Sequence, residues 1–250
     1  MAIPSRRDLE LNELRWWSTW ANAKRLGKDA YILNSDKFQE PFFNRASFIE
    51  CGAVSSQVGV AEEVFRLLGV TPIVTVNSSC LSVLDKLKAS GYRAYETMTV
   101  MMAGGHAKPM ASEEVEVGRI SVGAAKEWSR AYLLSFYGEE ALLSSVTGVA
   151  RRLVRNRSAT LLEARLDGTV AGVLAVFRTR RLAGIYCVGT VPKFRRRGVA
   201  GALLDRAAEI AASEGRRLIL QTLKSDGVEG FYSKRGFVDL YRKTFLRRES

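Results

Sequence analysis

A strand that stops at a proline and leads through a basic turn into a helix is the feature that most limits how this chain folds. The apolar, β-branched segment 182–191 predicts a strand, and Pro192 ends it. Arg195–Arg197 and Gly198 follow, and the spacing of apolar residues over 199–212 predicts a helix. Because such strand–turn–helix connections build α/β layers, the sequence predicts a mixed α/β fold.

The start of this helix has the properties of an anion site. Backbone N–H groups in a helix's first turn lack internal acceptors and, with the helix dipole, favour negative charge. Gly198 lets a phosphate approach the backbone without a Cβ in the way, and Arg195, Arg196 and Arg197 add fork-shaped donors. The sequence around them is neither a Walker loop nor the Gly-x-Gly-x-x-Gly fingerprint of dinucleotide sites. The alternative interpretation of the three arginines is a solvated basic turn.

The excess of positive over negative charge comes from the second part of the chain. The net charge is +12, yet residues 1–150 carry 16 basic and 17 acidic residues, whereas residues 151–250 carry 22 and 9. Such an excess suits a nucleic acid, a phosphate-bearing cofactor or a strongly solvated surface, and composition does not choose among them. Four of these arginines form a solvated helix end or face an acidic substrate: Arg151, Arg152, Arg155 and Arg157.

Composition excludes several classes of protein. With 47% hydrophobic and 26% charged residues, the chain is neither disordered nor collagen-like. No apolar run approaches the ~20 residues of a membrane-spanning helix, and the N-terminus lacks the apolar core of a secretory signal. The cysteines Cys51, Cys80 and Cys187 are odd in number and far apart. We therefore expect no disulfide framework, no metal site and a cytoplasmic location.

The chain is expected to form two domains, 1–110 and 112–250. The break between them is the Gly- and Pro-containing segment 103–109. In the first domain the pattern predicts a long helix over 9–26 and a helix over 60–68 that Gly69 ends. In the second it predicts the order β-α-α-β-β-β-α-β-α-β, with a hairpin at Asp167-Gly168.

A weak internal repeat links the two domains. Gly59-Val60-Ala61 is expected to open a helix that leads to a strand, a helix and Gly91-Tyr92. Gly198-Val199-Ala200 opens the same succession, which ends at Gly236-Phe237.

Two motifs in the second domain resemble those of the GNAT acetyltransferase superfamily. Arg195-x-x-Gly198-x-Ala200, after a strand and before a helix, resembles the pyrophosphate motif of that family. Tyr232-x-x-x-Gly236-Phe237 resembles the motif on its short late helix, although Ser225 stands where the family often has Asn. The resemblance covers roughly 116–248. It implies a mixed-sheet GNAT fold, complete in the C-terminal domain and degenerate in a GNAT-like N-terminal half.

The resemblance also implies a function, which is acetyl transfer from acetyl-coenzyme A to a primary amine by direct attack on the thioester. The backbone of Val188, Gly189 and Thr190 would then follow the pantetheine arm, and Tyr232 would act as the catalytic proton donor near the sulfur. Ser225 would lie at the position of the family's Asn. The pyrophosphate would be held by Arg195, Arg196, Arg197, Gly198, Val199 and Ala200.

Other interpretations of single residues stay open. Tyr232 could be a core aromatic residue, and Cys187 is more typical of a small buried hydrophobe than of a nucleophile. His106 lies in the Gly-rich segment as a bystander, and Glu163 is the nearest strand carboxylate, with a water relay or bulk solvent as equal alternatives for the base. The tryptophans Trp16, Trp17 and Trp20 either line an acceptor pocket, or two of them pack a helix face.

Two other functions compete with acetyl transfer. The chain could be a basic nucleic-acid-binding protein, or a catalytically inactive acetyl-coenzyme A-binding regulator. The motifs identify neither the acceptor, a small-molecule or peptide amine, nor the oligomeric state, and no membrane partner is expected.

Overall fold

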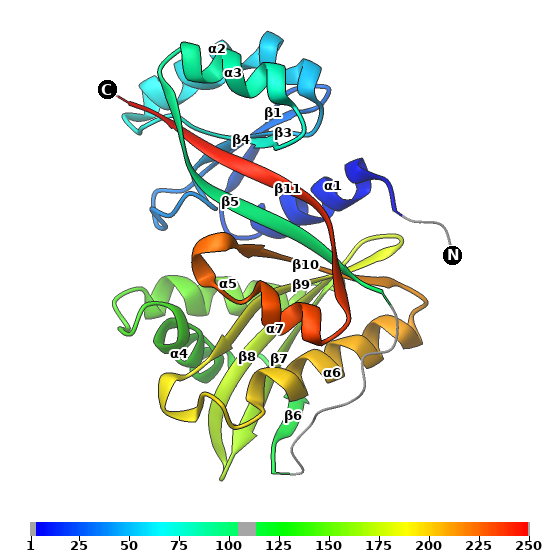
Figure 1. Cartoon of the computed structure of the whole chain (residues 1–250). Helices are drawn as coiled ribbons and strands as arrows, with labels where there is room; N and C mark the ends of the chain where they lie inside the picture. Colours follow the sequence, from blue (N-terminus) through cyan, green and yellow to red (C-terminus); the bar gives the residue numbers. More distant parts are fainter. Residues whose placement is uncertain (1–3, 105–113, 250) are drawn as a thin grey trace. The chain divides into compact units, whose positions relative to one another are not determined.

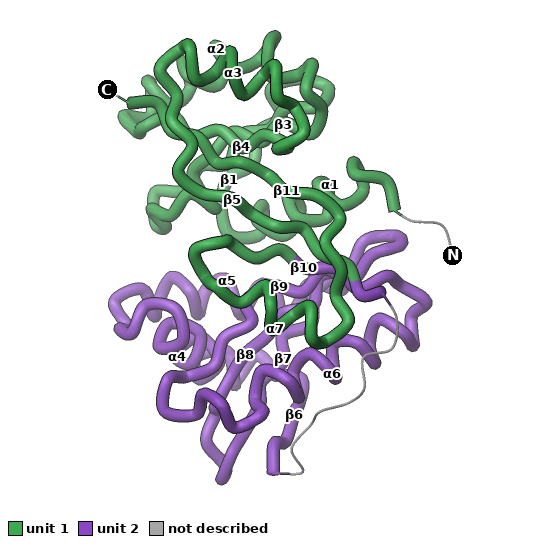
Figure 2. Tube along the Cα trace, in the orientation of Figure 1, with its two compact units in different colours: residues 1–102, 221–250 green, residues 103–220 purple. Residues whose placement is uncertain are grey.

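The computed structural model describes residues 4–104 and 114–249, which form two compact units (Figure 1). Unit 1 consists of residues 1–102 and 221–250, and unit 2 of residues 103–220 (Figure 2). Residues 221–250 therefore belong to the same compact unit as the N-terminal part of the chain. His106 and the expected boundary between residues 110 and 112 lie outside the described residues, so the domain limits stay a prediction.

Unit 1 is a mixed sheet with helices on both faces. Its strands lie in the order β1-β2-β3-β4-β11-β5. β1–β2, β2–β3 and β4–β11 are antiparallel, and β3–β4 is parallel. The elements are α1 Arg6–Trp17, β1 Asn22–Gly27, β2 Ala30–Asn34, β3 Arg45–Phe48, α2 Cys51–Leu68, β4 Ile73–Asn77, α3 Leu81–Ala89, β5 Tyr92–Ala103, the 3-10 turn Lys224–Asp226, α7 Glu229–Lys234 and β11 Phe237–Arg248.

The alternation of side chains along β2 places the helices of unit 1. Ile32 packs in one apolar cluster with Val54 and Phe65 of α2 and Leu84 of α3. Its neighbour Leu33 points to the other face and packs against α1. α2 and α3 therefore cover one face of the sheet and α1 the other. Trp16 on α1 is buried, and Trp20, which follows the helix, is buried beside it with ring centroids 6.0 Å apart.

Two expectations for unit 1 were wrong. The helix expected over 9–26 ends at Trp17, and Asn22–Gly27 instead pairs with β2 as an exposed edge strand. The helix that ends at Gly69 begins at Cys51, so Gly59 lies inside it and does not open it. The match of Gly59 to Gly198 in the internal repeat therefore fails at the helix start. Gly69 takes the left-handed conformation, with φ 66°, as its position at the helix end predicts.

A disulfide joins Cys51 and Cys80, contrary to the expectation from the sequence. Cys51 begins α2 and Cys80 precedes α3; the two helices pack together, which brings the Cα atoms to 5.6 Å. A distance of 29 residues along the chain thus says nothing about the distance in space. The expected reducing compartment loses the support that it drew from the cysteines.

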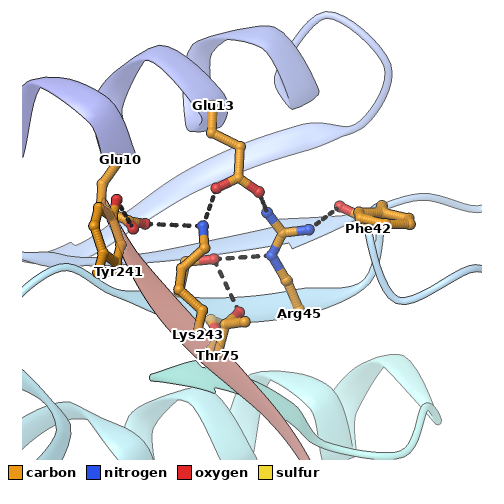
Figure 3. A network of polar contacts seen from close by, with 9 residues as sticks. Glu10, Glu13, Phe42, Arg45, Thr75, Tyr241 and Lys243 are labelled. Carbon is orange, nitrogen blue, oxygen red and sulfur yellow. Dashed lines mark hydrogen bonds and ion pairs between the residues drawn. The ribbon is translucent and has the colours of Figure 1, made fainter. Parts of the chain in front are cut away.

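Four charged side chains form a buried network in unit 1 (Figure 3). One oxygen of Glu13 in α1 accepts from Arg45 of β3 at 2.6 Å, and the other pairs with Lys243 of β11. Lys243 Nζ also lies 3.2 Å from Glu10, which accepts from the Tyr241 hydroxyl. Burial raises the pKa of Glu13, but Lys243 and Arg45 more than offset this effect and hold it below its ordinary value. The two carboxylates and two cations balance, so the network is neutral.

Unit 2 contains the first eight elements of the order that the sequence predicts for 112–250, and the last two, α7 and β11, follow in unit 1. The sheet of unit 2 is ordered β10-β9-β8-β7-β6. β6–β7, β7–β8 and β8–β9 are antiparallel, whereas β9–β10 is parallel. The predicted hairpin is confirmed, because Leu166 pairs with Thr169 across Asp167 and Gly168, both at positive φ. The elements are β6 Glu116–Arg119, α4 Ala125–Phe136, α5 Leu143–Arg155, β7 Ala159–Leu166, β8 Thr169–Arg178, β9 Leu182–Thr190, the 3-10 turn Pro192–Phe194, α6 Val199–Ser213 and β10 Arg217–Leu223.

Two glycines show which helix covers which face of the sheet in unit 2. A Cβ on Gly172 would lie 2.5 Å from Val199 Cγ1 of α6. A Cβ on Gly189 would lie 2.8 Å from the Cβ of Ser135 in α4. Gly189 pairs with Val173, the residue after Gly172, so the two glycines face opposite sides of the sheet. α4 therefore covers one face and α6 the other.

Candidate active site

The end of β9 extends beyond its parallel neighbour. The pairing of β9 with β10 runs from Leu182↔Arg217 to Ile185↔Leu220, whereas β9 continues to Thr190. Val188, Gly189 and Thr190, which were expected to contact a cofactor arm, all lie in this extension. On the side away from β8, its backbone amides and carbonyls lie beyond the parallel pairing, and such groups require other partners.

A β-bulge between Tyr186 and Gly189 changes the direction of the backbone at the start of this extension. The register with β8 moves from Tyr186↔Ala175 to Gly189↔Val173, so β9 carries one residue more than β8 between these pairs. Cys187 lies in the bulge with φ 55°, an unusual backbone conformation for a residue other than glycine. Burial raises the pKa of the Cys187 thiol, which therefore stays protonated at neutral pH. Cys187 itself is half-buried, and a protonated thiol is a poor nucleophile, so the structure favours a packing role for Cys187 over that of a nucleophile.

Close packing explains why glycines stand at this end of the sheet. Besides Ser135, a side chain on Gly189 would meet the Phe136 ring at 2.9 Å. A side chain on Gly172, which sequence reasoning missed, would also come within 2.7 Å of the carbonyl oxygen of Gly189. A glycine inside a strand often marks such a close approach, and this signal could have identified Gly172.

The basic turn that connects β9 to α6 contains two residues of positive φ. A 3-10 turn begins at Pro192, and Arg196 and Gly198 then adopt φ of 65° and 81°. Gly198 is the N-cap of α6, and within the described residues no side chain caps this helix end. The first turn of α6 holds no acidic residue. A 15-residue helix therefore presents its positive end at a glycine, next to the three arginines.

The three arginines are exposed, and two of them contact other parts of unit 2. Arg195 donates to the carbonyl oxygens of Thr190 at 3.4 Å and Ser135 at 3.2 Å. It therefore bridges the end of β9 and the end of α4. Arg197 lies 3.9 Å from Asp167, a largely exposed pair that contributes little to stability. Only one of these contacts involves a carboxylate, so they leave most of the charge of the three guanidinium groups in place.

The remaining two expected residues belong to unit 1. Tyr232 lies on α7, 8% exposed, with its ring against Phe231 and Phe237. Burial, and secondarily the charge of Asp226, raise the pKa of Tyr232. Ser225 is exposed in the 3-10 turn before α7. The Tyr232 hydroxyl is therefore buried and holds its proton at neutral pH, and this environment is compatible with both a core aromatic residue and a proton donor.

Glu163 is bound to an arginine. On β7 it accepts from Arg165 Nε at 2.8 Å, and Arg165 also binds Glu127 of α4. The register places Glu163 opposite Val173, which in turn lies opposite Gly189. Two strand spacings, ~10 Å, therefore separate Glu163 from the end of β9. This distance is too long for direct proton transfer, so Glu163 could act as the base only through a water relay.

The sequence of unit 2 and of the segment after it matches a known family. Residues 124–237 match the model of the Acetyltransferase (GNAT) family. These residues form a GNAT domain. The matched range contains every residue expected to bind the cofactor and Tyr232, and it supports acyl transfer as the general activity. Among curated proteins no sequence matches this chain.

Solved structures show that the GNAT fold extends over nearly the whole chain. A GCN5-related N-acetyltransferase from Kribbella flavida has a TM-score of 0.70 at 14% identity, over 98% of this chain and 95% of that one. Another from Sphaerobacter thermophilus has a TM-score of 0.70 at 17% identity, over 98% and 94%. A functionally unknown conserved protein from Staphylococcus epidermidis has 0.67 at 13%, over 92% and 94%. At these identities the likeness establishes the fold alone, and a degenerate GNAT-like N-terminal half stays a prediction.

No helix in the described part of the chain has the length and apolar character needed to cross a membrane.

Proposed function

We propose that this chain is an acetyl-coenzyme A-dependent N-acetyltransferase that acetylates a primary amine on a small molecule or peptide. One observation carries the proposal. The extension of β9 leads through the basic turn directly to the glycine-capped start of α6. A strand edge for an amide-bearing arm and a helix end for phosphates thus follow one another along the chain.

The residues present suit the diphosphate of this cofactor. The amides of Val199 and Ala200 belong to the first turn of α6, where backbone donors favour an anion. Gly198 tolerates the positive φ that the turn requires, and Arg195, Arg196 and Arg197 supply charge. Nothing acidic in the first turn of α6 opposes an anion. The same donor set would bind an anion of another kind, so the cofactor itself has to be tested.

The backbone of Val188–Thr190 would hold the pantetheine arm. Amides and carbonyls of the β9 extension that face away from β8, beyond the pairing with β10, can pair with the two amides of such an arm as a further strand would. The bulge at Cys187 changes the direction of the backbone just before this segment. Ser225 stands in the position of the family's Asn and offers a hydroxyl in place of a carboxamide.

Tyr232 is proposed as the proton donor. When bound, acetyl-coenzyme A supplies an acetyl group as an activated thioester. A raised pKa keeps the proton on the Tyr232 hydroxyl oxygen at neutral pH, ready for transfer to a leaving thiolate. Since an acid with a raised pKa gives up its proton less readily, we place its contribution at the low end of the ~10²–10⁴-fold range for such catalysis. The role rests on the motif and on this environment.

A cytoplasmic location belongs to the same proposal. It now rests on the family resemblance, since the cysteines no longer support it.

Thermal unfolding with acetyl-coenzyme A, followed by an assay of thiol release with a panel of amines, tests the proposed function. A specific ligand at about 100 times its Kd stabilises the folded state by ~2.7 kcal/mol. We expect acetyl-coenzyme A, and not nucleic acid, to raise Tm, and at least one amine to increase thiol release. A raised Tm without turnover on any amine would instead indicate a binding protein without activity. An unchanged Tm would contradict cofactor binding.

A further inference from the structure

A pocket lined by arginines lies at the opposite end of the sheet in unit 2. Its volume is about 460 Å³, in the range typical of small-molecule sites. Arg178, at the end of β8, is part of its lining, whereas Gly172 pairs with Thr190 at the end of the β9 extension. Arg178 lies six positions after Gly172 along β8, which corresponds to ~20 Å. The pocket is therefore separate from the proposed cofactor site.

Five guanidinium groups converge on this pocket from separate parts of unit 2. β6, α5, β8 and the segments that precede β7 and β10 each contribute one. Two of the four arginines considered for an acidic substrate, Arg155 and Arg157, are among them, whereas Arg151 and Arg152 are not part of the lining. Sequence spacing gave no signal that the other three would join them. The five are Arg119, Arg155, Arg157, Arg178 and Arg216.

Two of these arginines, Arg178 and Arg216, are bound to Glu214, the one acidic residue of the lining. Arg178 Nε lies 2.8 Å from both oxygens of Glu214, and another nitrogen of Arg178 donates to Thr160 at 2.9 Å. Arg216 Nε donates to Glu214 at 2.8 Å and another of its nitrogens to the carbonyl of Thr179. Burial raises the pKa of Glu214, but the hydrogen bonds from the two arginines outweigh this and lower it. The carboxylate is thus ionised and already satisfied.

The other three arginines carry the uncompensated charge. Arg119, Arg155 and Arg157 are exposed and have no ion-pair partner among the described residues. Arg155 also lies in the last turn of α5, where a cation favours the helix dipole. That explanation does not extend to Arg119 on β6 or Arg157 beyond the helix. With Glu214 counted, the lining has a net charge of +4, and several negative charges held in the hollow would offset it.

We propose that this arginine pocket binds a compact phosphate-rich anion with at least two phosphate groups. Planar guanidinium forks match phosphate oxygens two at a time, and five of them around one hollow can surround a short phosphate chain. A nucleic acid would instead need contacts spread along an extended face. Free polyphosphate and the phosphate chain of a nucleotide share this chemistry, and the experiment has to distinguish them.

Calorimetric titration of the full chain tests the pocket, with inorganic triphosphate and with ATP as ligands and coenzyme A present in excess. Coenzyme A occupies the proposed cofactor site, so any remaining heat reports another site. We expect one triphosphate per chain. The variant Arg119→Ala/Arg155→Ala/Arg157→Ala should lower its affinity about tenfold or more, since hydrogen bonds to charged groups are lost. ATP should bind with comparable affinity if the phosphates are what the pocket recognises.

The control removes the same charge elsewhere. Lys126, Arg151 and Arg180 are exposed residues of unit 2 outside the pocket lining. The variant Lys126→Ala/Arg151→Ala/Arg180→Ala should keep its affinity for triphosphate within about twofold, because isolated surface charges contribute little. Equal losses in the two variants, no triphosphate heat in the wild type, binding of ATP alone, or a preference for duplex RNA would each overturn the proposal. If the wild type bound triphosphate but not coenzyme A, the result would count against the proposed acetyltransferase function and not against the arginine pocket.

Discussion

Lys243 Nζ lies 3.2 Å from Glu10 Oε2, although 233 residues separate them along the chain. The two side chains are 5% and 6% exposed, so the contact joins α1 to β11 in the interior of unit 1. Arg45 and Glu13 complete the network (Figure 3). Ion pairs thus hold the last strand, β11, to the first helix, α1. Pairing with β4 holds the same strand in the sheet.

Replacing Lys243 by Met should destabilise the protein strongly. The substitution leaves two buried carboxylates with Arg45 as their remaining cation, and removal of one partner from a buried ion pair typically costs ~3–5 kcal/mol. Denaturant unfolding measures the change. Lys86→Met on the exposed surface of α3 is the control and should stay within about 0.5 kcal/mol of wild type. Similar losses for both variants would show that the network does not hold β11.

Acid should weaken the same network. The pKa of Glu13 in the folded state lies below its ordinary value of 4.5, so its contribution is complete above that value and is lost as the pH falls through the folded pKa. The free energy of unfolding should therefore decrease on acidification below about 4.5. Glu13→Gln should show a smaller decrease than wild type over this range. Parallel curves for the two proteins would remove Glu13 as a source of the acid sensitivity.

Tyr232→Phe should lower kcat by about 10²-fold and leave the affinity for acetyl-coenzyme A unchanged, because only the proton donor is lost. Since burial raises the pKa of Tyr232, ionisation of its hydroxyl should not reduce the wild-type rate below pH ~10. Tyr92→Phe, which removes another buried tyrosine hydroxyl of unit 1, serves as the control and should keep its rate. Wild-type turnover in Tyr232→Phe would exclude the hydroxyl from the mechanism.

Reduction of the Cys51–Cys80 disulfide should destabilise the protein. A bond that closes a loop of 29 residues contributes about 3–4 kcal/mol by limiting the unfolded chain. Unfolding curves with and without dithiothreitol measure this, and peptide mapping without reductant identifies the linked pair. Cys187→Ala should retain the full effect of the reductant, whereas Cys51→Ser/Cys80→Ser should show none. A linkage that involves Cys187 would refute the pairing.

Local signals predicted much of the GNAT domain from sequence. The hairpin at Asp167-Gly168 and the strand–turn–helix at Gly198 depend on residues within a few positions of each other, and both are confirmed. The family motif at Arg195 draws on the same local spacing. Such features can be predicted because turn conformation and helix starts are decided by neighbouring residues.

The features that were missed depend on contacts between distant residues. Asn22–Gly27 continues a helical pattern, yet pairing with β2 decides its conformation. Cys51 and Cys80 meet because α2 packs on α3, and the charges of Glu13 and Lys243 meet across most of the chain. The bulge at Cys187 arises from register with β8, which one strand's sequence does not encode. The arginine pocket likewise gathers residues from five separate segments.

Binding of the cofactor diphosphate at the start of α6 is tested most directly by calorimetry. The protein is titrated separately with acetyl-coenzyme A and with S-acetylpantetheine, which lacks the diphosphate. Gly198→Val imposes a side chain at φ 81° where the phosphate would approach, and Gly215→Val imposes similar strain, at φ 62°, beyond the other end of α6. We expect wild type and Gly215→Val to bind acetyl-coenzyme A alike and Gly198→Val to bind it about tenfold or more weakly, as loss of hydrogen bonds to a charged group predicts. The weak affinity for S-acetylpantetheine should be the same in all three proteins. Absence of heat with acetyl-coenzyme A in the wild type, or equal affinity in Gly198→Val, would contradict the proposed site.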